Sequence, residues 1–98
     1  MMTAEEAFRR TNEAVDEIIR EAERFANTSL DRELADIISC IKNLTESGRW
    51  NCTWTVNRGS TPRKRRRLAS VVMEYMKEEL GYGVDILGNQ LTIWWSNI

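Results

Sequence analysis

The fold is decided by residues 82–95, which read YGVDILGNQLTIWW. Gly88-Asn89 is a typical two-residue hairpin turn, so the residues on either side of it are expected to pair. This turn sets three apolar cross-strand pairs on one face: Val84 with Ile93, Ile86 with Leu91, and Tyr82 with Trp95. A slip of one residue would move all of these side chains to the other face, so the pattern specifies this register.

Upstream of the hairpin, residues 50–56 alternate apolar and polar side chains, which predicts a half-buried strand. A helix follows, because Ser60 or Thr61 can cap it, Pro62 fits its first position and Gly81 can end it. Its apolar face is expected to hold Leu68, Val71, Val72, Tyr75, Met76 and Leu80. The strands on either side of the helix are expected to run parallel with a right-handed crossover, and the last strand lies between them or beside either one.

The first half of the chain predicts two helices. Thr3-Ala4-Glu5-Glu6 is a capping box that starts the first one, and apolar residues then recur at intervals of three and four up to Phe25. Asn27-Thr28-Ser29 is expected to break this helix and to cap a second one, which ends at Ser47-Gly48. The sequence therefore predicts a helical hairpin over residues 3–47.

Together these elements predict a single α+β domain over residues 1–98. The N-terminal helical hairpin (residues 3–47) is followed by a strand–helix–β-hairpin unit with a three-stranded sheet (residues 50–96). The apolar seam on the first helix is wider than the second helix alone requires. Part of it is therefore expected to face the later helix or a second subunit, so we expect a homo-oligomer formed through the helical hairpin.

Composition argues against several classes of function. The chain has no His, so no Ser/His/Asp or Cys/His arrangement is possible, and no Gly-rich loop matches the phosphate-binding pattern. Two cysteines, Cys40 and Cys52, without any His make a poor metal site, and we expect both to be reduced and structural. We therefore expect no enzymatic activity, no metal and no cofactor.

The N-terminus has no apolar segment of the kind that a signal peptide needs, and the apolar runs are too short to span a bilayer. We therefore expect a cytoplasmic protein with no membrane partner.

Charge is unevenly placed on a chain whose net charge is −1. Residues 1–49 carry 7 basic and 11 acidic side chains, whereas residues 50–98 carry 7 basic and 4 acidic ones. Six of the latter basic residues fall in residues 58–67, the basic segment, at the start of the predicted helix. Since a helix N-terminus disfavours cations but binds anions, the cluster predicts a phosphate or acidic partner. The candidate ligand residues are Arg58, Ser60, Thr61, Arg63, Lys64, Arg66 and Arg67. The alternative is pairing with carboxylates of the first helix or of another subunit.

Trp94 is a second candidate, because the register places it on the polar face of the sheet with Thr53, Thr55 and Thr92. An aromatic ring there can stack on a base. The alternative is that the helical hairpin or a subunit covers it.

The C-terminal half resembles a pattern in many small phage proteins. Residues 79–84, ELGYGV, and residues 91–95, LTIWW, carry the resemblance, which extends over about residues 50–96. It implies phage origin, the fold above, and an accessory, virion-associated or defence-countering role in the host cytoplasm. It carries no catalytic residue across, and the basic segment is not part of the pattern.

Three functions remain. The first is a non-enzymatic phage accessory protein that counters host defence by binding a phosphate-bearing ligand, such as a signalling nucleotide, or a defence protein. The second is a nucleic-acid-binding module that uses the basic segment. The third is a structural or assembly protein whose basic segment pairs with an acidic surface of its own oligomer.

Overall fold

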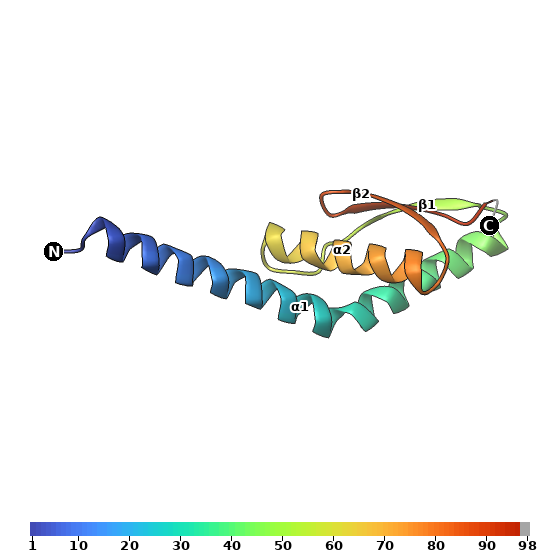
Figure 1. Ribbon diagram of the computed structural model, residues 1–98. Coiled ribbons are helices and arrows are strands. Elements are labelled where there is room, and N and C mark those ends of the chain that lie inside the picture. Colours follow the sequence, from blue (N-terminus) through green and yellow to red (C-terminus); the bar gives the residue numbers. More distant parts are fainter. Residues whose placement is uncertain (97–98) are drawn as a thin grey trace.

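The computed structural model describes residues 1–96 and shows an α+β protein built along one long helix. The elements follow in the order α1 (Ala4–Glu46), β1 (Asn51–Thr55), α2 (Pro62–Glu78), β2 (Gly83–Leu87) and β3 (Gln90–Trp94). Figure 1 shows α2 and the sheet stacked over the C-terminal half of α1, while its N-terminal half projects away from them. The predicted α+β class and three-stranded sheet are confirmed.

The predicted helical hairpin is wrong, because α1 continues through Asn27-Thr28-Ser29 as one helix of 43 residues. These residue types cost at most about 0.7 kcal/mol each inside a helix, and packing repays that cost. Ala26 and Leu34, on either side of the expected break, are both buried in the core. The Thr28 hydroxyl donates to the carbonyl oxygens of Arg24 and Phe25 instead of capping a new helix. Such bonding bends helices, and Figure 1 shows that α1 bends in its middle.

The sheet has the strand order β1-β3-β2, with β3 antiparallel to both neighbours. β1 and β2 therefore point the same way with the last strand between them, which is one of the predicted arrangements. The predicted hairpin register is confirmed, since Val84 pairs with Ile93 and Ile86 pairs with Leu91. Gly88 adopts a φ of 63° in the turn, where a Cβ would be unfavourable.

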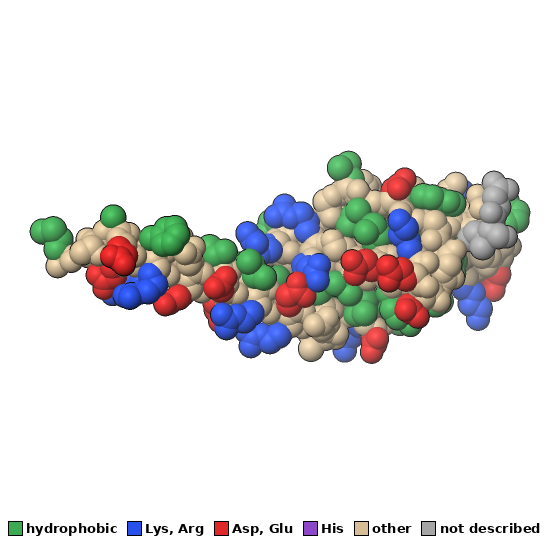
Figure 2. Space-filling model, in the orientation of Figure 1, with side chains coloured by type: hydrophobic (Ala, Val, Ile, Leu, Met, Phe, Trp, Pro, Cys, Tyr) green, Lys and Arg blue, Asp and Glu red, His purple; other side chains and the backbone are tan. Residues whose placement is uncertain are grey.

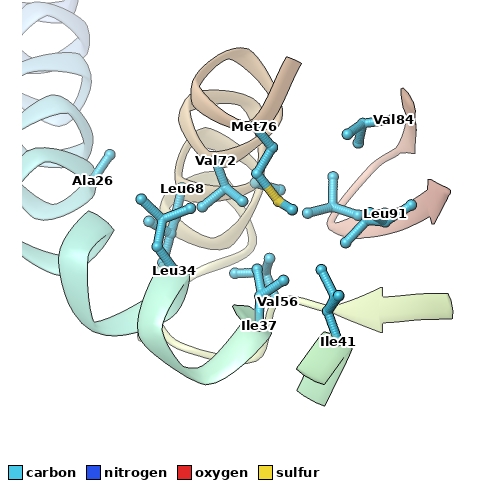
Figure 3. Packing of buried hydrophobic residues seen from close by; sticks show 12 residues of the cluster. Ala26, Leu34, Ile37, Ile41, Val56, Leu68, Val72, Met76, Val84 and Leu91 are labelled. Carbon is cyan, nitrogen blue, oxygen red and sulfur yellow. The ribbon is translucent and has the colours of Figure 1, made fainter. Parts of the chain in front are cut away.

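The core lies between α1, α2 and one face of the sheet, as Figure 3 shows. Its largest fully buried side chains come from all three layers: Ile37, Val56, Leu68, Val72, Met76, Leu91 and Ile93. On α2 the apolar face predicted from the sequence is buried at Leu68, Val72 and Met76, whereas Tyr75 remains exposed, as does Leu80, which lies beyond the end of the helix. The core thus fixes α2 against α1 and places the start of α2 beside the middle of α1.

The projecting part of α1, residues 4–21, is called the arm below. Every residue from Phe8 to Glu21 is exposed. The molecule consequently measures 66 × 22 × 19 Å, and its radius of gyration is 17.5 Å. A compact chain of this length would have a radius of gyration of about 13 Å.

Candidate functional site

The first turn of α2 begins as the sequence predicts. Thr61 is the N-cap, its hydroxyl accepts a hydrogen bond from the backbone N–H of Lys64 at 3.2 Å, and Pro62 occupies the first position. The first turn contains no acidic residue. The basic segment therefore lies at a helix end that does not favour positive charge, and its side chains need other partners.

Arg58 has its partners within the chain. It donates from Nη1 to Glu33 Oε2 at 2.8 Å and from Nη2 to Asp36 Oδ2 at 3.2 Å. Glu33 is only 4% exposed and also accepts a hydrogen bond from Trp54 Nε1 at 2.9 Å. Arg58 thus compensates a buried carboxylate, so the structure assigns it to the fold and not to a free ligand site.

Arg67 is also paired, across the helix interface with Glu23 of α1. Its Nη2 donates to Glu23 Oε2 at 3.0 Å, and its Nε lies 2.8 Å from Oε1. The Nε proton is not aligned for a hydrogen bond, so the second contact is electrostatic only. Both side chains are partly exposed, and such a pair contributes about 1 kcal/mol or less.

Two further cations of the segment hold the loop before α2. Arg65 donates from Nη1 to the carbonyl oxygen of Gly59 at 2.9 Å. Lys64 Nζ lies 3.5 Å from the Ser60 hydroxyl and 5.9 Å from the centre of the Phe25 ring. Pairing with carboxylates of the same chain, the predicted alternative, therefore holds for Arg58 and Arg67, whereas Arg65 and Lys64 contact only a backbone carbonyl and a hydroxyl of the loop and the Phe25 ring.

The remaining cations line a groove between the start of α2 and the end of the arm. Among the described residues, Arg63 and Arg66 make no side-chain hydrogen bond or ion pair, and both are exposed. The groove, called the head groove below, has a volume of about 370 Å³. It is lined by Ile18, Glu21 and Ala22 of α1 and by Thr61, Pro62, Arg63, Lys64 and Arg66. The structure thus brings together four of the seven predicted ligand residues and leaves out Arg58, Ser60 and Arg67.

Trp94 lies on the outer face of the sheet, as predicted, because it pairs with Asn51 and Gly83 in the strand register. Its indole covers Gly83 so closely that a Cβ at that position would overlap the ring. Both helices pack against the opposite face (Figure 1), so the expected cover by the helical hairpin is wrong, while cover by a subunit stays a prediction. The ring is half-buried by its own neighbours and its role in stacking a base stays a prediction.

The arm carries an exposed apolar stripe. The sequence indicated its apolar spacing but not its exposure. Phe8, Val15, Ile18 and Ile19 are 71%, 43%, 48% and 43% exposed. Helical spacing puts them on the same side of α1 as Ala22 and Ala26, which are buried. Figure 2 shows this line of hydrophobic side chains leading along the arm to the cluster of Lys and Arg where α2 begins. The sequence indicated a wide seam, but the expected hairpin partner for it does not exist.

The two cysteines are free thiols, as predicted. Burial raises the pKa of the Cys52 thiol above its ordinary value, and the nearby Cys40 adds to this rise. Across the described residues, no group of three or more His, Cys, Asp or Glu side chains could hold a metal ion. Within residues 1–96, neither helix combines the length and the hydrophobicity that crossing a membrane requires.

Comparison with protein families, with curated proteins and with solved structures finds no match to this chain. The arm and the head groove are therefore the features of the molecule that point to a function.

Proposed function

We propose that this protein is a non-enzymatic assembly protein that associates with itself through the arm. The observation that carries the proposal is the apolar stripe of Phe8, Val15, Ile18 and Ile19, which no other described element covers. An amphipathic helix normally buries such a face against another element. Because α1 is held only from Ala22 onward, the arm presents its stripe to a partner.

The free energy gained by burying the stripe is of the same order as the cost of association, which favours weak self-association. Fully burying a side chain of this size contributes about 1.5–3 kcal/mol, and roughly half remains available where a side chain is already half-covered. Two paired arms bury eight such side chains, which corresponds to about 6–12 kcal/mol. Association costs about 4–15 kcal/mol in lost freedom, so the two quantities are of the same order. The assembly is consequently expected to depend on protein concentration.

Charge argues for a protein partner and against an anionic membrane surface. The arm carries six acidic and three basic side chains, a net charge of −3. Helices that lie in a membrane interface typically present Lys and Arg on their polar face. The acidic polar face of the arm would instead be repelled by anionic lipids.

Light scattering coupled to size exclusion tests this proposal. The wild-type chain should show a molar mass above the chain mass of 11.4 kDa, and this mass should fall on dilution. Val15→Ser should shift the protein towards the monomer, whereas Glu13→Ser, on the opposite side of the arm, should not. A wild-type mass of one chain at every concentration would contradict the proposal.

A second candidate function is anion binding in the head groove. It is favoured by Arg63 and Arg66, which line the groove with no ion-pair partner among the described residues and outnumber Glu21, the one carboxylate among the lining residues. Calorimetric titration with cyclic and linear nucleotides would show saturable heat that Arg63→Ala/Arg66→Ala removes. Nucleic-acid binding by the same residues would instead give an affinity that falls steeply with salt. The resemblance to phage proteins, and the role against host defence that it implies, stays a prediction.

A further inference from the structure

We propose that the partner of the arm is a second copy of this chain lying antiparallel to it, with its Phe8 seated in the head groove. This inference rests on the proposed self-association and adds its orientation, its register and the site that receives the partner. Three observations carry it: the position of α2, the spacing of the stripe and the distribution of charge.

The position of α2 excludes a parallel pair of arms. The stripe lies on the side of α1 that α2 covers from Ala22 onward. In a parallel pair the two α1 helices would continue side by side past this point, and both α2 helices would need the space between them. In an antiparallel pair, the α1 helix of the other copy runs back along the arm. Its N-terminal end, at Ala4, then lies where α2 begins. The uncovered part of the stripe on one copy is therefore as long as the arm of the other copy, which covers it.

The spacing of the stripe sets the register. Phe8, Val15 and Ala22 repeat every seven residues, and Ala4, Thr11 and Ile18 form a second series between them. An antiparallel pair that joins the two series places Phe8 beside Ile18, Thr11 beside Val15 and Ala4 beside Ala22. A two-fold axis makes each contact occur twice. Phe8 then enters the head groove, whose apolar wall is formed by Ile18, Ala22 and Pro62.

The charges at the two ends of the arm are complementary in this arrangement. Glu5 and Glu6 form the acidic first turn of α1. Helical spacing puts Glu5 on the flank of the stripe, whereas Glu6 lies on the opposite side of α1 and pairs with Arg10 at 3.3 Å. The antiparallel register brings Glu5 to the head groove of the other copy, where Arg63 and Arg66 outnumber the single carboxylate of Glu21. Carboxylates also stabilise a helix N-terminus, and two such termini meet here. A parallel pair would instead place the acidic turns of both copies together.

Single-cysteine cross-linking tests the orientation, in a chain with Cys40→Ser and Cys52→Ser. Thr11→Cys and Val15→Cys are made separately and oxidised alone or after mixing and exchange under reducing conditions. We expect a disulfide-linked dimer from the mixture and little from either variant alone, because residue 11 lies beside residue 15 of the other copy. Efficient cross-linking of Thr11→Cys alone would show parallel arms and overturn the inference, while the proposed self-association would stand. A monomeric chain by light scattering would overturn both.

Charge reversal tests the contact at the head groove. Glu5→Arg and Arg63→Glu/Arg66→Glu should each weaken the dimer at least about tenfold, because each creates like charges at both ends of the pair. An equimolar mixture should recover a dimer, since both ends become complementary. Glu13→Arg is the matched control on the opposite side of the arm and should have little effect. Failure of the mixture to associate better than either variant alone would overturn the placement of the acidic turn.

Anion binding by the wild-type dimer tests the seating of Phe8. Binding that persists in the dimer would show that the head groove is open and would overturn the seating of Phe8.

Discussion

At the scale of single residues, Glu33 joins the helical layer to the sheet. Its carboxylate is buried and accepts hydrogen bonds from Trp54 of β1 and from Arg58 of the loop that leads to α2. A buried carboxylate without partners would cost several kcal/mol, so the two donors are necessary for the fold. One cation of the basic segment, the partly buried Arg58, is thereby committed to this contact.

Replacing Glu33 tests this role. Glu33→Ala leaves the Trp54 indole N–H without a partner and leaves Arg58 with Asp36 alone, so the free energy of unfolding should fall by about 2–3 kcal/mol. Asp36→Ala is the control, because Asp36 is exposed and its pair should contribute less than about 1 kcal/mol. Urea denaturation followed by circular dichroism measures both. Equal losses in the two variants would show that burial of Glu33 is not what makes its contacts important.

Cys52 gives a second prediction at this scale. Because burial and Cys40 raise the pKa of its thiol, the folded protein should form the reactive thiolate at higher pH than the unfolded protein does. A raised pKa also contributes to the free energy of unfolding while the thiol is protonated. This contribution is fully present below the pKa that Cys52 has in the unfolded protein, and it is lost as the pH rises through the pKa of Cys52 in the folded protein. Alkylation rates of Cys52 against pH, measured by peptide mass spectrometry on folded and urea-unfolded protein, should show this displacement. Coincident pH profiles would contradict it.

At the scale of elements, the C-terminal half could be predicted and the N-terminal half could not. The register of β2 and β3 follows from Gly88-Asn89 and from alternation, which depend on local sequence only. The end of the first helix was predicted from Asn27-Thr28-Ser29, but these residues only weaken a helix slightly. Whether the helix continues depends on what packs on both sides, here Leu68 and Val72 of α2, and local sequence does not contain that information.

The candidate site likewise combines features that follow from local sequence with contacts that depend on the packing of distant residues. Clustering of cations at the start of α2 and capping by Thr61 are local features, and both were predicted. The pairing of Arg58 with Glu33 and of Arg67 with Glu23 joins residues more than twenty positions apart, so it depends on the packing of α1. With α1 predicted as a hairpin, these partners could not be assigned, and neither could the uncovered stripe.

The continuity of α1 gives the prediction at this scale. Thr28→Pro removes a backbone donor in the middle of a helix and should lower the free energy of unfolding by about 3 kcal/mol or more. Thr28→Ala keeps the helix and should change the stability by less than about 0.5 kcal/mol. Thermal and urea unfolding measure both variants. If Thr28→Pro were as stable as the wild-type protein, residues 27–29 would have to be a loop, and α1 would not be one helix.

At the scale of the whole molecule, the arm makes the chain elongated and leaves an apolar stripe without a partner. The proposed antiparallel pair uses the arm to join two copies of the chain. It covers both stripes, seats each Phe8 in a head groove and places the two sheets at opposite ends of the assembly.

The shape of the assembly in solution tests this account most directly. The arm is about 27 Å long. Two chains of 66 Å that overlap along their arms should therefore reach a maximum dimension of about 105 Å. Small-angle X-ray scattering should give this dimension together with twice the chain mass of 11.4 kDa. Twice the mass with a maximum dimension near 66 Å would contradict the antiparallel arrangement, and the mass of a single chain would contradict assembly through the arm.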